Sequence, residues 1–209
     1  MSRFTFRDPE RREIEPSVWL NTLVARYNEW GARHGNRDNR VYFELIAKQG
    51  SLSGDDFEQI GQWKEQCWPP NLGRWKTGTP AAYDVWMQAK ATLPICPDKN
   101  GVAAFLKDWS ERRSLASHKQ RKDGQPFTQA FGVSRATTLL HFVSGGFYPI
   151  LDSTVQASLV RLGSPVDNTI GEYVNIFCPL FLELASVCGL SGTEGLRQLD
   201  NALMTYASD

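Results

Sequence analysis

The sequence predicts an all-α fold, and three observations support this class. Apolar residues recur at helical spacing through most of the chain, no stretch keeps the period-two alternation of a half-buried strand, and Gly and Pro gather between the expected helices. With 41% apolar and 22% charged residues, the 209 residues can bury a real core. We expect one domain with two helical lobes, roughly 1–98 and 99–209, around a shared groove.

Four helices are expected in the first lobe. One begins near Pro16, because proline is well tolerated in the first turn of a helix, and its apolar residues recur every three or four positions as far as Trp30. Ser53 and Asp56 have the spacing of a capping box, which predicts the start of another helix. The remaining two are expected over residues 40–48 and 80–91.

The second lobe is expected to be helical as well. Val102, Phe105, Leu106 and Trp109 follow the i, i+3, i+4, i+7 pattern of a helix that packs against a core, within residues 99–113. Further helices are expected over residues 137–142, 154–162, 170–188 and 193–206.

Charge is unevenly distributed along the chain. Lys and Arg total 23 and Asp and Glu total 23, so the net charge is zero, which argues against a protein held to nucleic acid by bulk charge. Residues 1–124 nevertheless contain 20 basic and 16 acidic residues, whereas residues 125–209 contain 3 and 7. This imbalance is compatible with orientation on a polyanion, and it also arises by chance in many enzymes.

Cysteine content and hydropathy favour a soluble protein of a reducing compartment. The four cysteines lie far apart and form no CxxC pair, so neither a zinc site nor a disulfide framework is expected. The charged amino terminus has no signal-peptide core, and the apolar stretch around residues 176–190 is too short and too interrupted to span a bilayer. We expect a cytoplasmic monomer that needs no metal or cofactor.

One segment contains residues suited to binding a phosphate. Gly132 can adopt the positive φ that a tight turn between helices requires, and Ser134 can cap the helix that follows. Such a turn points backbone N–H groups outward at a helix amino terminus, where they suit a phosphate oxygen. The residues expected to make this contact are Gly132, Val133, Ser134, Arg135 and Thr137.

Asp152 is the candidate reactive carboxylate. The apolar run over residues 148–151 carries the chain out of the core, and Val155, Leu159 and Leu162 give the next helix an apolar face. Asp152 is thereby placed at a helix start, where it acts either as an N-cap alone or also as a carboxylate that faces a groove.

Together these residues resemble the helix-hairpin-helix signature of the base-excision DNA glycosylase superfamily (HhH-GPD). Gly132-Val133-Ser134 stands for the family's Gly-Val-Gly hairpin, Leu151-Asp152-Ser153-Thr154-Val155 for the segment with the catalytic aspartate, and Arg161-Leu162-Gly163 for the end of the next helix. Order and spacing match over about a sixth of the chain. The resemblance implies a two-lobed helical fold with the hairpin element over about 126–144 and the aspartate segment over 148–163.

The resemblance also implies a monofunctional enzyme. Family members that cut the DNA backbone carry a lysine at the start of the second hairpin helix, where this chain has Ala136, and no lysine follows Lys122. Arginine stays protonated and does not form the Schiff base of a lyase. Asp152 would stabilise the oxocarbenium-like transition state and orient the attacking water on a base rotated out of double-stranded DNA. The excised base is either a damaged base of cellular DNA or a modified base of phage DNA, such as glucosylated hydroxymethylcytosine.

Further residues are candidates for contact with DNA. A basic stretch before the hairpin acts either as a solvated loop or as a set of phosphate contacts, and it contains Arg112, Arg113, Lys119, Arg121 and Lys122. Trp68, Trp75 and Tyr148 are expected to stack on the extruded base, and Glu44 is a weaker candidate for protonating it. His141 is expected to be a packed helix residue rather than a base.

Two other hypotheses remain open. The hairpin could serve a DNA-binding module without catalysis, which predicts binding without base release. Alternatively, the chain could be a helical scaffold whose likeness to the signature is accidental, which predicts no salt-dependent DNA binding.

Overall fold

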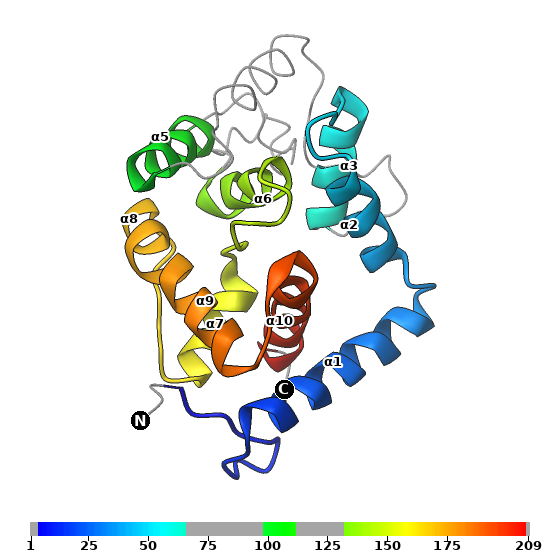
Figure 1. Cartoon of the computed structure of the whole chain (residues 1–209), viewed down its shortest axis with the longest axis vertical. Helices are drawn as coiled ribbons and strands as arrows, with labels where there is room; N and C mark the ends of the chain where they lie inside the picture. The colour runs from blue at the N-terminus through cyan, green and yellow to red at the C-terminus, as the bar shows by residue number, and fades with distance from the viewer. Residues whose placement is uncertain (1–3, 66–97, 112–131, 208–209) are drawn as a thin grey trace, which may run out of the picture. The chain divides into compact units, whose positions relative to one another are not determined.

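The computed structural model describes residues 4–65, 98–111 and 132–207. Within these ranges the chain forms helices and turns and no strand, apart from one isolated antiparallel bridge between Arg7 and Glu13 (Figure 1). The all-α class is therefore confirmed for these residues, whereas the helix expected over 80–91 lies outside them. The helices are α1 (Pro16–Arg33), α2 (Arg37–Ala47), α3 (Gly54–Glu65), α5 (Lys99–Ser110), α6 (Val133–Val143), α7 (Ser153–Arg161), α8 (Ile170–Glu172), the π-helical η2 (Tyr173–Phe177), α9 (Cys178–Val187) and α10 (Gly192–Ala207).

The chain forms two units, and their boundaries differ from the expected ones. Unit 1 comprises residues 1–39 and 146–209, and unit 2 comprises residues 40–145. The expected lobes, 1–98 and 99–209, would place the first and last helices in different units. Instead α1 packs against α10, so the first and last helices share one core.

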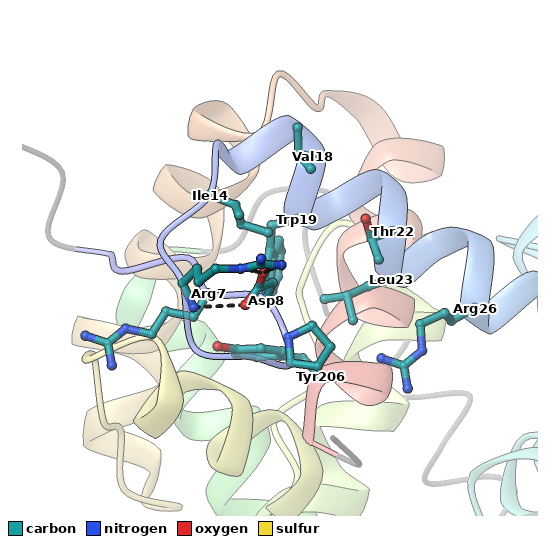
Figure 2. Close-up of a pocket in the computed structure, with 11 residues that line it drawn as sticks. Arg7, Asp8, Ile14, Val18, Trp19, Thr22, Leu23, Arg26 and Tyr206 are labelled. Atoms are coloured by element: carbon teal, nitrogen blue, oxygen red, sulfur yellow. Dashed lines mark hydrogen bonds and ion pairs between the residues drawn. The ribbon is translucent and has the colours of Figure 1, made fainter.

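The core of unit 1 forms where α10 packs against α1 and α7. Trp19 of α1 meets Tyr206 of α10 edge to face, with ring centroids 5.4 Å apart, and both side chains are buried (Figure 2). The Ser158 hydroxyl of α7 donates to the carbonyl oxygen of Leu203 in α10. The backbone N–H of Thr5 donates to the carbonyl oxygen of Leu162 at 3.1 Å, which fixes the amino-terminal segment over the end of α7.

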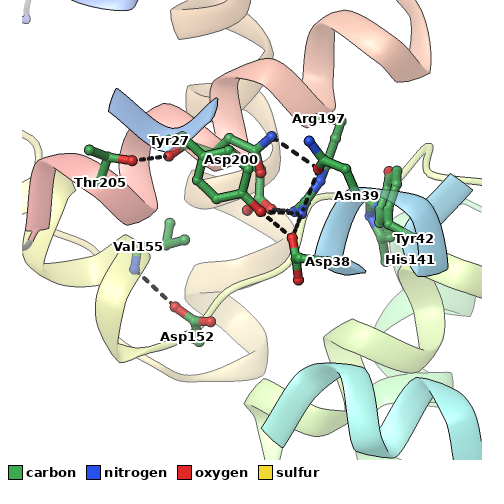
Figure 3. Close-up of polar contacts among 11 residues, drawn as sticks. Tyr27, Asp38, Asn39, Tyr42, His141, Asp152, Val155, Arg197, Asp200 and Thr205 are labelled. Carbon is green, nitrogen blue, oxygen red and sulfur yellow. Dashed lines mark hydrogen bonds and ion pairs between the residues drawn. The ribbon is translucent and has the colours of Figure 1, made fainter. Parts of the chain in front are cut away.

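A buried guanidinium joins α10 to the start of α2. Arg197 is 2% exposed, and its Nη1 donates to Asp200 at 2.6 Å, while Nη2 donates to Asp38 and, at 3.1 Å, to the Tyr27 hydroxyl (Figure 3). The Tyr27 hydroxyl donates to the same Asp38 oxygen. Burial raises the pKa of Tyr27 above its ordinary value despite the nearby guanidinium, so this hydroxyl stays a donor.

We expect Arg197→Met to destabilise the protein by about 3–5 kcal/mol, because the carboxylates of Asp38 and Asp200 would remain largely buried without their cation. Urea unfolding of the wild type and the variant measures this difference. Arg33→Gln, at the exposed end of α1, is the control and should change the free energy of unfolding by less than about 0.5 kcal/mol. A loss of similar size in both variants would contradict the assigned role of Arg197.

One apolar helix in unit 1 is less interrupted than the sequence suggested. α8, η2 and α9 run on continuously over Ile170–Val187, because the widened π turn before Pro179 accommodates a residue that has no N–H to donate. By length and composition this helix, with a mean hydropathy of 1.3, is the one helix of the described ranges that could cross a membrane. Core helices meet the same criterion, and Tyr173, Phe177 and Phe181 are buried within the unit.

Unit 2 is organised around α6, which packs against α3 and α5. Residues 136–143 of α6 are all buried. Phe142 meets Trp63 of α3 edge to face, with centroids 5.2 Å apart. Nε2 of His141 is 2.9 Å from the hydroxyl of buried Tyr42, which confirms the expectation that His141 is a packed residue.

The capping box predicted at the start of α3 is confirmed. The Asp56 carboxylate accepts hydrogen bonds from the backbone N–H of Ser53 at 2.7 Å and from its hydroxyl at 2.8 Å, while that hydroxyl accepts from the Asp56 N–H at 3.3 Å. Lys48 forms an ion pair with Asp56 at 2.6 Å. Burial by itself raises the pKa of Asp56, but the bonds from Lys48 and Ser53 outweigh it and hold the pKa below the ordinary 3.8.

We expect Asp56→Asn to lower the free energy of unfolding by about 1 kcal/mol at neutral pH. Because the folded-state pKa of Asp56 lies below its unfolded value, the carboxylate contributes this stability above about pH 4 and loses it as the pH falls further. Thermal unfolding from pH 7 to pH 2 should therefore show the gap between wild type and variant closing at low pH. Asp55→Asn, at the exposed neighbouring position, should show a smaller gap; a pH-independent gap for Asp56→Asn would refute this account.

Candidate functional site

Asp152 is the N-cap of α7, as the sequence suggested. Its backbone is extended, with φ −134° and ψ 177°. The carboxylate Oδ1 accepts from the N–H groups of Thr154 at 3.0 Å and Val155 at 2.9 Å, and Figure 3 shows the second of these bonds. The residue is half-buried. These two bonds satisfy otherwise unpaired donors of the first helical turn, and they fix the carboxylate at the positive end of the helix dipole.

The segment before Asp152 is held firmly in unit 1. Ile150 and Leu151 are buried, and the Tyr173 hydroxyl donates to the carbonyl oxygen of Pro149 at 2.7 Å. Burial raises the pKa of Tyr173 well above its ordinary value, so the hydroxyl remains a donor. After Asp152, the buried side chain of Val155 anchors the first turn of α7 in the core of unit 1.

Gly132 has the backbone conformation that the hairpin prediction required. Its φ of 83° with ψ of 161° is accessible almost only to glycine, and it serves as the N-cap of α6. Its own N–H donates to the carbonyl oxygen of Ser110 at 2.9 Å and is therefore committed to the fold, in contrast to the expectation that it contacts a phosphate. Among the described residues, no acceptor is found for the backbone N–H of Val133 or Ser134.

Two further expectations for the hairpin are corrected. Ser134 is not the cap, because it lies inside α6, where its carbonyl oxygen accepts from the hydroxyls of Thr137 and Thr138, each at 2.9 Å. Thr137 is fully buried, so its side chain supports the helix rather than reaching a DNA backbone. Val133, Ser134 and Arg135 are each partly exposed.

The remaining candidates have ordinary surroundings or lie outside the described residues. Glu44, in unit 2, has a side chain 55% exposed and sits 4.0 Å from Arg40, as a surface carboxylate does. Tyr148, in unit 1, is half-buried and its ring lies edge to face with that of Phe147, with centroids 5.0 Å apart. Arg112, Arg113, Lys119, Arg121, Lys122, Trp68 and Trp75 fall in the ranges that the structure does not describe.

Asp152, Tyr148 and Arg161 belong to unit 1, whereas the hairpin and Glu44 belong to unit 2. Sequence reasoning missed the role of Arg161. Its Nη1 donates to the carbonyl oxygen of Tyr206, and its guanidinium lies 4.2 Å from the centroid of the Tyr206 ring. The partner lies on a helix distant in sequence, so no local pattern could have revealed it.

Among the described residues, no group of His, Cys, Asp and Glu is suited to hold a metal ion.

Comparison with known proteins found no matching family model, no matching curated protein and no matching solved structure.

We expect the cap and the charge of Asp152 to be separable. Asparagine caps a helix about as well as aspartate, so Asp152→Asn should change the free energy of unfolding by less than about 0.5 kcal/mol, whereas Asp152→Ala should cost about 1 kcal/mol. Urea unfolding measures both. If Asn were as damaging as Ala, the charge itself would be needed for folding.

Proposed function

We propose that this protein is a monofunctional DNA N-glycosylase, which rotates a damaged or modified base out of the duplex and excises it, leaving an abasic site. The single observation that carries the proposal is the placement of Asp152, a half-buried carboxylate fixed at a helix start by two backbone N–H groups. It is supported by the resemblance of the surrounding residues to the helix-hairpin-helix signature.

The residue type suits the reaction. As the bond between C1′ and the base nitrogen breaks, its electron pair leaves with the base and positive charge develops on the deoxyribose ring. A carboxylate next to the ring stabilises that charge and orients a water molecule toward C1′. The water oxygen then bonds to C1′, and its proton passes to the carboxylate or to solvent. Both capping bonds end on Oδ1 of Asp152, which fixes the orientation of the carboxylate.

The amino terminus of α6 supports a DNA-contacting role. The Gly132 conformation turns the chain sharply into the helix, and the first N–H groups of a helix favour a phosphate oxygen. The backbone N–H groups of Val133 and Ser134 and the side chain of Arg135 are the proposed phosphate donors, since these three residues are partly exposed. The Gly132 N–H and the Thr137 side chain are excluded, because both are committed to the fold.

Lyase chemistry is not part of the proposal. Ala136, at the position where the related lyases have lysine, is fully buried, and the chain has no lysine after Lys122. The expected products are a free base and DNA with an intact backbone at an abasic site. The substrate is either a damaged base of cellular DNA or a modified base of phage DNA, since the folded pocket sets this choice rather than the motif.

A non-catalytic DNA-binding module is the second candidate. It is favoured by the fact that capping alone gives the Asp152 carboxylate a structural role.

We expect base release to depend on the charge of Asp152. Mass spectrometry of free bases would be applied to ordinary, alkylated, oxidised, uracil-containing and modified phage DNA, each treated with wild type and with Asp152→Asn. A base released by the wild type should fall at least about 100-fold with the variant, because general acid–base and electrostatic effects of one group are of this size. Duplex binding should persist.

Asp98→Asn is the matched control. Asp98 is also an N-cap aspartate, accepting from the Gly101 N–H at 2.7 Å, but it lies exposed at the start of α5. This variant should keep full activity. Salt-sensitive duplex binding without base release from any DNA would favour the binding module, and neither binding nor release would refute both proposals.

A further inference from the structure

A pocket in unit 1 lies apart from Asp152, at the other end of α7. It has two neighbouring compartments, of about 250 and 340 Å³, which share Arg7, Asp8, Pro9 and Tyr206 as lining residues. Figure 2 shows the residues that line the first compartment. Asp152 caps the first turn of α7. Arg161, which lines the second compartment, is the last residue of the same helix. A helix of this length is about 13 Å long, so the two places are separate.

The smaller compartment has an apolar wall. Ile14, Val18 and Leu23 line it together with the rings of Trp19 and Tyr206. Val18 is 52% exposed, so part of this apolar wall is open to solvent. The wall suits a small apolar or aromatic group, because covering it would remove apolar surface from water.

The rim of the pocket is strongly basic. Arg7, Arg12 and Arg26 line the first compartment, and Arg7, Arg11 and Arg161 line the second. Asp8 is the one carboxylate in either lining, and it is engaged by Arg12, whose Nε donates to it at 2.7 Å and whose backbone N–H donates at 2.9 Å. Arg12 also pairs with Glu10 at 2.5 Å. Within the described ranges, the side chains of Arg7 and Arg11 form no ion pair.

The turn over residues 8–12 places one arginine in an unfavourable backbone conformation. Arg11 has φ 66°, the left-handed region that glycine would adopt more cheaply. The turn is closed by bonds from the Asp8 N–H to the Arg12 carbonyl at 3.0 Å and from the Arg11 N–H to the Asp8 carbonyl at 2.9 Å. The left-handed conformation itself does not require arginine.

We infer that this pocket binds a small organic anion, whose apolar or aromatic group lies against the wall of the first compartment and whose phosphate or carboxylate meets Arg7 and Arg11. Guanidinium groups bind such oxyanions through paired, charge-assisted hydrogen bonds. The pairing of an apolar wall with a cationic rim selects molecules that have both parts. This inference does not depend on the proposed glycosylase activity.

Phenyl phosphate is the probe, and the indole N–H resonance of Trp19 is the reporter, assigned by its loss in Trp19→Phe among the seven Trp of the chain. We expect titration of the full-length protein to shift this resonance, with a Kd of about 1 mM or tighter. Inorganic phosphate and benzyl alcohol each have one of the two parts and should bind at least about tenfold more weakly.

Arg11→Gly separates binding from folding. It removes the guanidinium but suits the left-handed backbone, so thermal stability should not fall, while the affinity for phenyl phosphate should drop about tenfold. Asn36→Gly is the matched control, because Asn36 also has a positive φ, of 51°, and does not line the pocket. It should leave the affinity unchanged.

Three outcomes would overturn the inference. The first is that phenyl phosphate leaves the Trp19 resonance unshifted. The second is that inorganic phosphate binds as tightly as phenyl phosphate, which would make the rim a plain anion site. The third is that Arg11→Gly weakens binding of a duplex without affecting phenyl phosphate, which would assign the arginines to a DNA backbone instead.

Discussion

Unit 1 depends on one buried positive charge. Arginine does not lose its proton in a protein, so the core around Arg197 must supply negative partners. Asp200 comes from the same helix, but Asp38 comes from the start of α2, so the ion pair fixes the end of the α1 segment against α10. Helix α10 in turn supports α7 through Ser158, and α7 presents Asp152. Arg197 thus supports the position of the candidate carboxylate through α10, the helix that packs against α7.

The two ends of α7 use opposite properties of a helix. At its amino terminus, exposed N–H groups attract the carboxylate of Asp152. At its carboxyl terminus, Arg161 is well placed by the helix dipole and donates to the last turn of α10, while its guanidinium covers the Tyr206 ring. The short helix α7 therefore positions the Asp152 carboxylate for one candidate site and the Arg161 guanidinium for the other.

Helix caps, which depend on neighbouring residues, could be predicted from the sequence. Contacts between helices distant in sequence could not. The Ser53–Asp56 capping box, the helix start at Pro16 and the cap at Asp152 depend on neighbours within four residues, and they are found as predicted. The sequence predicts Ser134 as the cap of α6, but the cap is Gly132, because the choice between adjacent turn residues depends on the φ that Gly132 adopts. Arg197 and Arg161 have partners on helices distant in sequence, so no local pattern indicates them.

The charge of Asp152 is the part of the site that folding does not explain. Ser, Thr and Asn cap helices as well as aspartate does, and Thr169 caps α8 in this chain with its hydroxyl. A capping aspartate alone is not evidence of catalysis, because exposed Asp98 caps α5 in the same way. Asp152 differs in being half-buried, preceded by buried Ile150 and Leu151, and held by two N–H groups on a single oxygen. A negative charge held in a fixed position is what stabilisation of a cationic sugar requires.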